Sequence, residues 1–271
     1  MTDQWRLLTT PPARGAWNMA VDEAILESAG RGESLPTLRL YAWNPACLSL
    51  GYAQPFGDVN LPALAAHGWE IVRRPTGGRA ILHTDELTYS VTAPLDEPRV
   101  SGTILESYSR LANALIRAVR ELGLPVEMQE NEPVEKLGNN PVCFEVPSTY
   151  EITVGGKKLI GSAQARRKEG VLQHGSLPLY GDLTRITQAL IFSDDSARQR
   201  AASRLLERAT TVETVLNRII DWQTAADTLA QAFERQLDLE LIPAELTAKE
   251  NARARELLRE HYEHDGWTKR I

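Results

Sequence analysis

The clearest hydrophobic pattern in the chain lies between residues 104 and 122. Apolar side chains recur there every three or four positions, a spacing that places them on one face of an α-helix. Gly123 and Pro125 follow, and both residue types commonly end helices. We therefore predict an amphipathic helix. Its apolar face comprises Ile104, Tyr108, Leu111, Leu115, Val119 and Leu122.

A different pattern, the alternation of apolar and polar residues, occupies residues 149–154 and indicates a β-strand. The Gly155-Gly156 pair that follows suits a two-residue reversal, so we expect residues 157–163 to run back beside the first strand. Residues 166–170 form a charged turn before another strand-like run at 171–177. The sequence thus predicts a three-stranded antiparallel meander.

Shorter patterns complete the predicted fold, which is α+β. Strands and helices gather in separate regions and do not alternate as βαβ units. We predict a mixed, largely antiparallel sheet flanked by helices, with a helical C-terminal region. The remaining predicted elements are helices over 18–29, 61–67, 193–237 and 244–262, and strands over 38–41, 47–52 and 69–73 with more strand up to residue 93.

The composition is that of an ordinary globular protein. The 271 residues are 42% hydrophobic, which is enough to bury the core of one large domain with or without a small appendage. An acid precedes any apolar run at the start, unlike in a signal peptide. No apolar stretch reaches the length of a membrane span, which is about 18 residues or more. We expect a soluble, cytoplasmic protein that binds no membrane.

Charge and cysteine content exclude further classes. A net charge of −6 argues against non-specific binding of nucleic acid, because such binding needs a basic surface. The two cysteines cannot form a disulfide framework and lack the neighbours of a structural zinc site. Two local basic clusters are candidates for contact with an acidic protein or a phosphate-bearing arm, although solvated loop charge explains them equally well. They comprise Arg73, Arg74 and Arg79, and Lys157, Lys158, Arg166, Arg167 and Lys168.

Two segments carry candidate chemistry. Gly77 and Gly78 follow a predicted strand, and paired glycines let backbone N–H groups approach an anion or carbonyl, although a simple tight turn is the commoner use. Cys143 lies in a loop before the predicted hairpin, where a reactive thiol can be displayed. A bare cysteine is more often a buried small apolar residue.

The two hairpin lysines help to decide whether the Cys143 thiol is reactive or merely buried. Lys157 and Lys158 must point to opposite faces of their strand, because successive residues of a strand do so. A cationic amine close to Cys143 would lower the pKa of its thiol, whereas an exposed hairpin lysine would do nothing. Acyl transfer also needs an acid or base, for which Glu145, His83 and His174 are candidates that spacing alone cannot rank.

Several runs between residues 73 and 176 together resemble the lipoate and biotin protein ligase superfamily, and most closely its octanoyltransferase branch of the LipM type. Weaker similarity, including WNMAVDEAIL at 17–26, extends over most of the chain. The resemblance implies the catalytic-domain fold of that superfamily over residues 33–240 and a C-terminal helical tail over 241–271. The matching runs are RRPTGGRAILH followed by DELTYS, PVCFEVPSTYEI, and GGKKLIGSAQARRKEGVLQHGS.

This resemblance implies an acyl transfer in two steps without cofactor or metal. Cys143 would take octanoate from octanoyl-acyl carrier protein as a thioester and pass it to a lysine of the glycine cleavage H protein or another lipoyl domain. Lys158 would lower the thiol pKa and contact the acyl carbonyl. The residues that would line the acyl and pantetheine pocket are Arg73, Gly77, Gly78, Arg79, His83, Gly161, Ser162, Ala163 and His174.

Three alternatives stay open. An ATP-dependent lipoate–protein ligase would need no nucleophilic cysteine, but those ligases have a third glycine and a later Asn-containing run. Here Arg79 and Glu86-Leu87-Thr88 occupy these places, and both departures favour the transferase. An amidotransferase acting between lipoyl domains also uses a cysteine, in a context less like CFEVPS. A non-catalytic module that docks acylated carriers is the third alternative.

Overall fold

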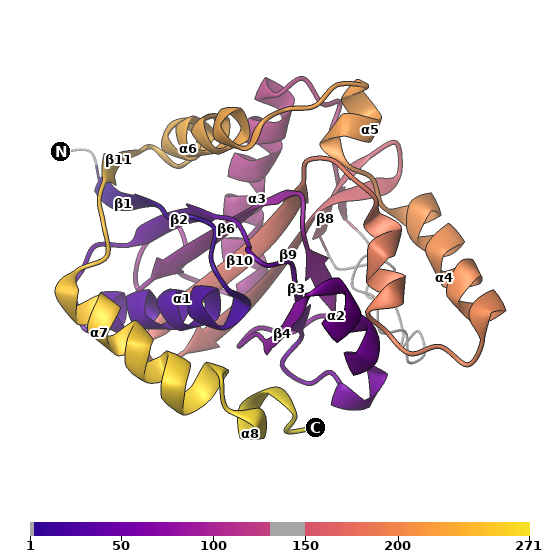
Figure 1. Cartoon of the computed structure of the whole chain (residues 1–271). Helices are drawn as coiled ribbons and strands as arrows, with labels where there is room; N and C mark the ends of the chain where they lie inside the picture. Colours follow the sequence, from indigo (N-terminus) through magenta and orange to yellow (C-terminus); the bar gives the residue numbers. More distant parts are fainter. Residues whose placement is uncertain (1–2, 131–149) are drawn as a thin grey trace.

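The structure is a computed structural model that describes residues 3–130 and 150–271, and a mixed β-sheet forms its centre (Figure 1). Within this sheet β1 pairs in parallel with β2 and β11, and the remaining neighbouring pairs are antiparallel. In spatial order its strands are β11 (Leu239–Pro243), β1 (Asp3–Thr9), β2 (Thr37–Tyr41), β6 (Glu86–Ala93), β10 (Gly170–Pro178), β9 (Lys157–Arg167), β8 (Tyr150–Val154) and β7 (Glu127–Glu130).

The predicted meander is confirmed as strands β8, β9 and β10. Gly155 and Gly156 turn the β8–β9 hairpin with φ values of 56° and 74°. This left-handed conformation favours glycine. Strand β10 also pairs with β6, so His174 lies between Ala163 on one side and Ser90 on the other. This register brings two segments of the LipM-like motif side by side.

A second, three-stranded sheet carries the glycine-rich segment. It contains β4 (Glu70–Arg73), β3 (Cys47–Leu50) and β5 (Ile81–His83) in that spatial order. Helix α2 (Leu61–His67) precedes β4 and has the predicted bounds. The Asn60 side chain accepts a hydrogen bond from the Ala63 N–H at the start of α2, and Gly68 ends the helix with a φ of 65°.

Helices cover both faces of the large sheet (Figure 1). Helices α3 (Ile104–Glu121) and α6 (Trp222–Leu237) pack on one face and bury the largest hydrophobic cluster. Helices α1 (Gly15–Gly30) and α7 (Ala248–Leu257) pack together on the other face. The predicted helix over 104–122 is therefore confirmed, and a capping box between Thr103 and Glu106 fixes its start.

The long helical region predicted over 193–237 consists of three helices. Asp194 caps the first by accepting a hydrogen bond from the Ala197 N–H. Thr211 and Asp221 cap the next two helices with side-chain oxygens, so each break coincides with a new N-terminal signal. These three helices are α4 (Asp195–Arg208), α5 (Val212–Leu216) and α6. Elsewhere the chain has short helical turns over Phe56–Asp58, Leu183–Gln188 and Leu258–Tyr262, and a last short helix, α8 (Asp265–Thr268).

Strands β1 and β11 were not predicted from the sequence. Both faces of β1 are covered, with Trp5 in the cluster under α3 and α6 and Leu8 in the cluster under α1 and α7, so β1 shows no simple alternation. The buried Arg6 side chain on β1 binds Glu250 of α7 through two hydrogen bonds of 2.6 and 3.1 Å. The N-terminal strand and C-terminal helix are thereby joined.

These elements form the predicted α+β arrangement of a mixed, largely antiparallel sheet flanked by helices. The predicted boundary between residues 240 and 241 falls inside β11, and the division of the chain at that point stays a prediction. Among the helices that the structure describes, none is both long enough and apolar enough to cross a bilayer.

Candidate active site

Two adjoining cavities lie where the glycine-rich loop after β4 faces strand β9. The wide cleft, of about 850 Å³, is bounded by residues 52–54, residues 77–79 and residues of β9. The narrow pocket, of about 40 Å³, has room for only a few water molecules. Gly78 and Ser162 line both cavities, so the cavities meet there.

The Arg74 guanidinium fixes the glycine-rich loop. It donates hydrogen bonds to the carbonyl oxygens of Ser49, Gly77 and Arg79 at 3.0, 2.8 and 2.7 Å. Gly78 has a φ of 92°, a value that favours glycine. The Gly78 carbonyl oxygen lies only 1.9 Å from where a Cβ on Gly51 would be. The loop is thus held by an arginine beneath it and by close contact with a neighbouring backbone.

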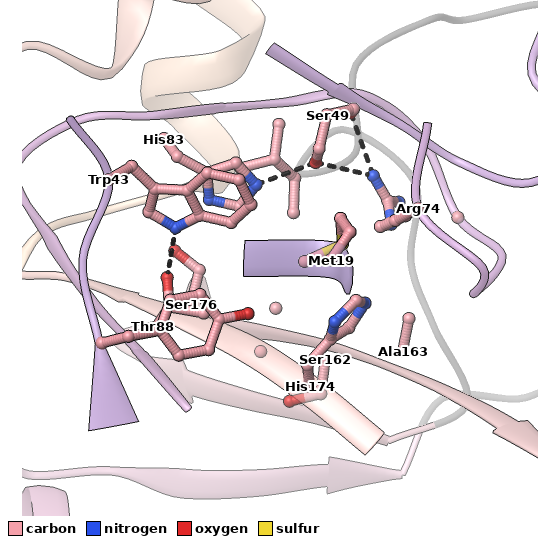
Figure 2. A pocket seen from close by; sticks show the side chains of 15 residues that line it. Met19, Trp43, Ser49, Arg74, His83, Thr88, Ser162, Ala163, His174 and Ser176 are labelled. Atoms are coloured by element: carbon pink, nitrogen blue, oxygen red, sulfur yellow. Dashed lines mark hydrogen bonds between the residues drawn. The ribbon is translucent and has the colours of Figure 1, made fainter. Parts of the chain in front are cut away.

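Trp43, His83, Ser49 and Arg74 lie along one side of the narrow pocket (Figure 2). His83 Nε2 lies 2.8 Å from Ser49 Oγ, and His83 Nδ1 lies 2.6 Å from Glu86 Oε1. The His83 ring also stacks on Trp43 with centroids 3.9 Å apart. Burial raises the pKa of Glu86, but His83 and neighbouring hydroxyls outweigh burial and hold the pKa below its usual value. Glu86 is therefore a carboxylate that orients His83.

His174 connects the opposite wall of the narrow pocket to helix α1. Its Nε2 lies 2.6 Å from Thr76 Oγ1, and its Nδ1 faces the buried Asp22 carboxylate at 3.7 Å. Burial lowers the pKa of His174 although Asp22 opposes this, so the ring is neutral at pH 7. Burial raises the pKa of Asp22, but Arg39 at 2.7 Å and His174 bring it below the usual value.

The two hairpin lysines have different surroundings. Lys158 is 5% exposed and lines the wide cleft. Lys157 is half-buried and donates a hydrogen bond of 2.6 Å to the Leu206 carbonyl oxygen. Strand pleating explains the difference, because neighbouring residues point to opposite faces. Lys158 is thus the lysine beside the glycine-rich loop.

Part of the predicted basic clusters serves the fold. Arg166 donates to the Val100 carbonyl oxygen and, at 3.0 Å, to Ser107 Oγ, so it ties β9 to the start of α3. Arg167 forms an ion pair of 2.9 Å with Glu23 of α1. Both arginines still line the wide cleft, as do Lys158 on the same strand and Arg79 on the glycine-rich loop, so the lining of the cleft carries positive charge.

The structure brings together nearly all of the predicted site residues that it describes. Gly77, Gly78, Arg79, Lys158 and Ser162 line the wide cleft. The lining of the narrow pocket includes Gly78, His83, Gly161, Ser162, Ala163 and His174. Cys143 and Glu145 lie outside the described residues.

Arg73 departs from the prediction that it lines the pocket. It is fully buried and lines neither cavity; its guanidinium donates to carbonyl oxygens of Gly51, Gln54 and Thr268 at 2.8, 2.7 and 2.9 Å. Arg74, the next residue, lines the narrow pocket instead. Adjacent residues of a strand point to opposite sides, so only one of the two can face the cavity.

Several residues at the site were not identified from sequence. Asp22 is one of them, and it lies in the middle of α1 on a buried face. A carboxylate among the apolar residues of an otherwise buried segment was the available signal, because a buried charge needs a partner. Ser49 and Thr76 gave no such signal. Within residues 3–130 and 150–271, no group of three or more His, Cys, Asp or Glu residues is arranged to hold a metal ion.

Sequence comparison identifies relatives along the whole chain. Octanoyltransferase LipM of Symbiobacterium thermophilum is 40% identical over 275 residues, which cover 100% of both chains. Octanoyltransferase LipM of Moorella thermoacetica is 42% identical over 270 residues, covering 99% of this chain and 98% of the relative.

Structural comparison identifies lipoate protein ligases. A bi-partite lipoate protein ligase of Thermoplasma acidophilum superimposes with a TM-score of 0.79 and 27% identity over 99% of this chain and 96% of that one. A lipoate-protein ligase A bound with ATP gives a TM-score of 0.77 and 27% identity over 99% of both chains. The model of the lipoyl protein ligase A/B catalytic domain matches residues 14–234. Because this match covers most of the chain, including strands β2 to β10, the glycine-rich loop and the meander, the chain belongs to the lipoyl protein ligase A/B catalytic-domain family.

Proposed function

We propose that this chain transfers an octanoyl group from octanoyl-acyl carrier protein, through a thioester on Cys143, to a lysine of a lipoyl-domain protein such as the glycine cleavage H protein. Octanoyl transfer is the activity by which its relatives in S. thermophilum and M. thermoacetica are named. Their identities of 40% and 42% along the full length support the same activity here, as a step of lipoate biosynthesis in the cytoplasm.

The observation that carries the proposal is the position of Lys158. This lysine is buried, lines the wide cleft, and lies in the same cleft wall as Ser162, where the narrow pocket begins. An ammonium group in the cleft wall offers a positive charge to a carbonyl oxygen or thiolate that enters the cleft. Met19, Trp43 and Ile81 give the narrow pocket an apolar lining, and a hydrocarbon chain entering it would have to widen it. The wide cleft has room for the arm that delivers the chain.

The proposed transfer needs no energy source other than the donor thioester. The Cys143 thiolate attacks the carbonyl carbon of the donor thioester, the carrier's sulfur leaves, and that sulfur takes up a proton. The acceptor lysine amine then attacks the new thioester, an amide forms, and the Cys143 thiolate is regenerated as the amine loses a proton. The first step exchanges one thioester for another, and the second forms a more stable amide.

Each step passes through a tetrahedral oxyanion that needs hydrogen-bond or charge stabilisation. We assign this role to the Lys158 ammonium and to backbone N–H groups of the glycine-rich loop. In other enzymes the loss of one such donor slows the reaction by about 100-fold to 1,000-fold. The same ammonium lowers the pKa of a nearby thiol, because it favours the thiolate.

ATP-dependent ligation is the second candidate, since one structural relative is a lipoate-protein ligase A bound with ATP. The two reactions differ in a requirement that can be measured directly. A ligase must activate a free acid with a nucleotide, whereas the proposed transferase needs only the carrier thioester.

The experiment is intact mass spectrometry of the protein after mixing with octanoyl-acyl carrier protein in the absence of ATP. We expect one added octanoyl group that peptide mapping places on Cys143 and that disappears in Cys143→Ser. The matched control is Cys47→Ala. Cys47 is fully buried, and burial raises the pKa of its thiol well above the usual value, so it should not react.

Two results would contradict the proposal. Undiminished transfer to a lipoyl domain by Cys143→Ser would exclude the thioester on this residue. Transfer that occurs only with free octanoate and ATP would favour the ligase instead.

A further inference from the structure

The segment after α7 lies against the loop that forms one wall of the wide cleft. This loop, residues 51–56, joins β3 to the turn Phe56–Asp58, and its residues 52–54 line the cleft. The Phe56 N–H donates a hydrogen bond of 2.7 Å to the Ile271 carbonyl oxygen. We name residues 267–271 the C-terminal strap.

Arg73 is the junction between the loop and the strap. Its guanidinium donates to the carbonyl oxygens of Gly51, Tyr52 and Gln54 on the loop. The same guanidinium donates to the Thr268 carbonyl oxygen at 2.9 and 3.1 Å. In return, the Trp267 Nε1–H donates to the Arg73 carbonyl oxygen at 2.8 Å. A buried cation therefore holds the loop and the strap in one arrangement.

Arg270 supplies a second connection through Tyr52. Its Nη2 donates to the Tyr52 carbonyl oxygen at 2.8 Å, and its guanidinium lies 3.6 Å from the centre of the Tyr52 ring. The same guanidinium lies 4.5 Å from the centre of the Trp267 ring, which meets the Tyr52 ring edge-on at 5.8 Å. Cation–π contacts of this kind stabilise the packed arrangement of the three side chains.

These bonds orient the backbone of the cleft wall. In a trans peptide the C=O of one residue and the N–H of the next point in opposite directions. Because Arg73 and Arg270 hold the Tyr52 carbonyl on the strap side, the N–H of Ala53 points to the other side of the loop. Ala53 is exposed and lines the wide cleft.

We infer that the C-terminal strap, through Arg73 and Arg270, positions the loop of residues 51–56 so that it docks the amide-containing arm of the acyl donor. The Ala53 N–H is placed to donate to an amide carbonyl of that arm. Arg73 and Arg270 are thus positioning residues that never touch the substrate. The inference rests on the proposed function for the identity of the arm, but the strap's hold on the loop does not depend on it.

The first experiment measures steady-state transfer from octanoyl-acyl carrier protein by Arg270→Met. The variant keeps most of the length of the side chain and loses its hydrogen bond and cation–π contacts. We expect the KM for the donor to rise by about tenfold while kcat changes by less than about twofold, because the lost contact acts on binding. Trp267→Phe, which keeps an aromatic ring and loses the N–H donor, should change KM in the same direction.

The matched control is Arg255→Met on the exposed side of α7, which should leave both constants unchanged. A merely structural role for Arg270 would lower kcat together with the thermal stability and leave KM alone. That result, or an unchanged KM in a folded Arg270→Met protein, would overturn the inference.

The second experiment needs no activity. Hydrogen–deuterium exchange of the amides in residues 51–56 should speed up in Arg270→Met and in Trp267→Phe, but not in Arg255→Met. Unchanged exchange would show that the strap does not hold the loop. Faster exchange in a protein that transfers nothing from the carrier would instead refute the proposed function and leave the strap in place.

Discussion

His174 Nε2 on β10 lies 2.6 Å from Thr76 Oγ1, the hydroxyl of the residue that precedes the paired glycines. The imidazole is neutral, so its Nε2 either accepts a hydrogen bond from the Thr76 hydroxyl or donates one to it, and the tautomer decides which. This hydrogen bond links the central sheet to the glycine-rich loop. Because Asp22 of α1 faces the other ring nitrogen, a helix, a strand and a loop meet at one side chain.

Replacing Thr76 tests this connection. Thr76→Val keeps the shape but leaves the buried His174 Nε2 without its partner, so we expect the free energy of unfolding to fall by about 1–3 kcal/mol and acyl transfer to slow. Thr76→Ser keeps the hydroxyl and should cost no more than about 1 kcal/mol for the lost methyl. Urea unfolding and transfer rates measured on the two variants give the comparison. Equal effects of Val and Ser would show that the hydrogen bond contributes nothing.

The burial of His174 predicts a pH dependence of stability. Its folded-state pKa is lowered from 6.5, so the unfolded state binds the proton first as the pH falls. The free energy of unfolding should therefore decrease as the pH falls below about 6.5, and be fully retained above it. In His174→Gln the decrease between pH 7.5 and pH 5.5 should be smaller than in the unmodified protein. Parallel curves for the two proteins would assign the pH dependence to other groups.

The close approach of two backbones predicts opposite effects for two glycines. A Cβ at Gly51 would lie 1.9 Å from the Gly78 carbonyl oxygen, so Gly51→Ala must push the cleft wall away from the glycine-rich loop. We expect it to cost about 1–3 kcal/mol of stability and to impair transfer. A Cβ at Gly57 meets nothing within 4 Å. Gly57→Ala should therefore be neutral or stabilise by up to about 1 kcal/mol. Thermal unfolding of both variants measures the two effects. A Gly51→Ala protein as stable as the Gly57→Ala protein would contradict the prediction.

The proposed effect of Lys158 on Cys143 can be measured from thiol reactivity. In a Cys47→Ala background, alkylation by iodoacetamide reports the ionisation of Cys143 alone. Lys158→Met should move the midpoint of the alkylation rate to higher pH, toward the free-thiol value of about 8.5, because a neutral side chain no longer favours the thiolate. Lys157→Met is the control, since Lys157 binds the Leu206 carbonyl oxygen. An unmoved midpoint in Lys158→Met would remove the electrostatic role assigned to this lysine.

Local sequence patterns predicted those parts of the fold that depend on near neighbours. Helical spacing predicted α3, and alternation with a Gly-Gly pair predicted the β8–β9 hairpin, because side-chain period and turn geometry are properties of a few consecutive residues. Strand β11 escaped prediction because its partner, β1, lies at the other end of the chain. Strand β1 escaped prediction because it is buried on both faces and shows no simple alternation.

For the site, the sequence by itself determined which motifs occur. Because it predicted the meander, it also indicated which residues pair across neighbouring strands. Only the tertiary structure decided that Arg74 lines the pocket and Arg73 does not. Arg73 is held by the Thr268 carbonyl oxygen, 195 residues farther along the chain, and no local pattern contains that contact. Likewise, Asp22 could be matched with His174 only after α1 had packed on the sheet. The partners of buried charges are chosen by packing, and packing joins residues that sequence spacing keeps apart.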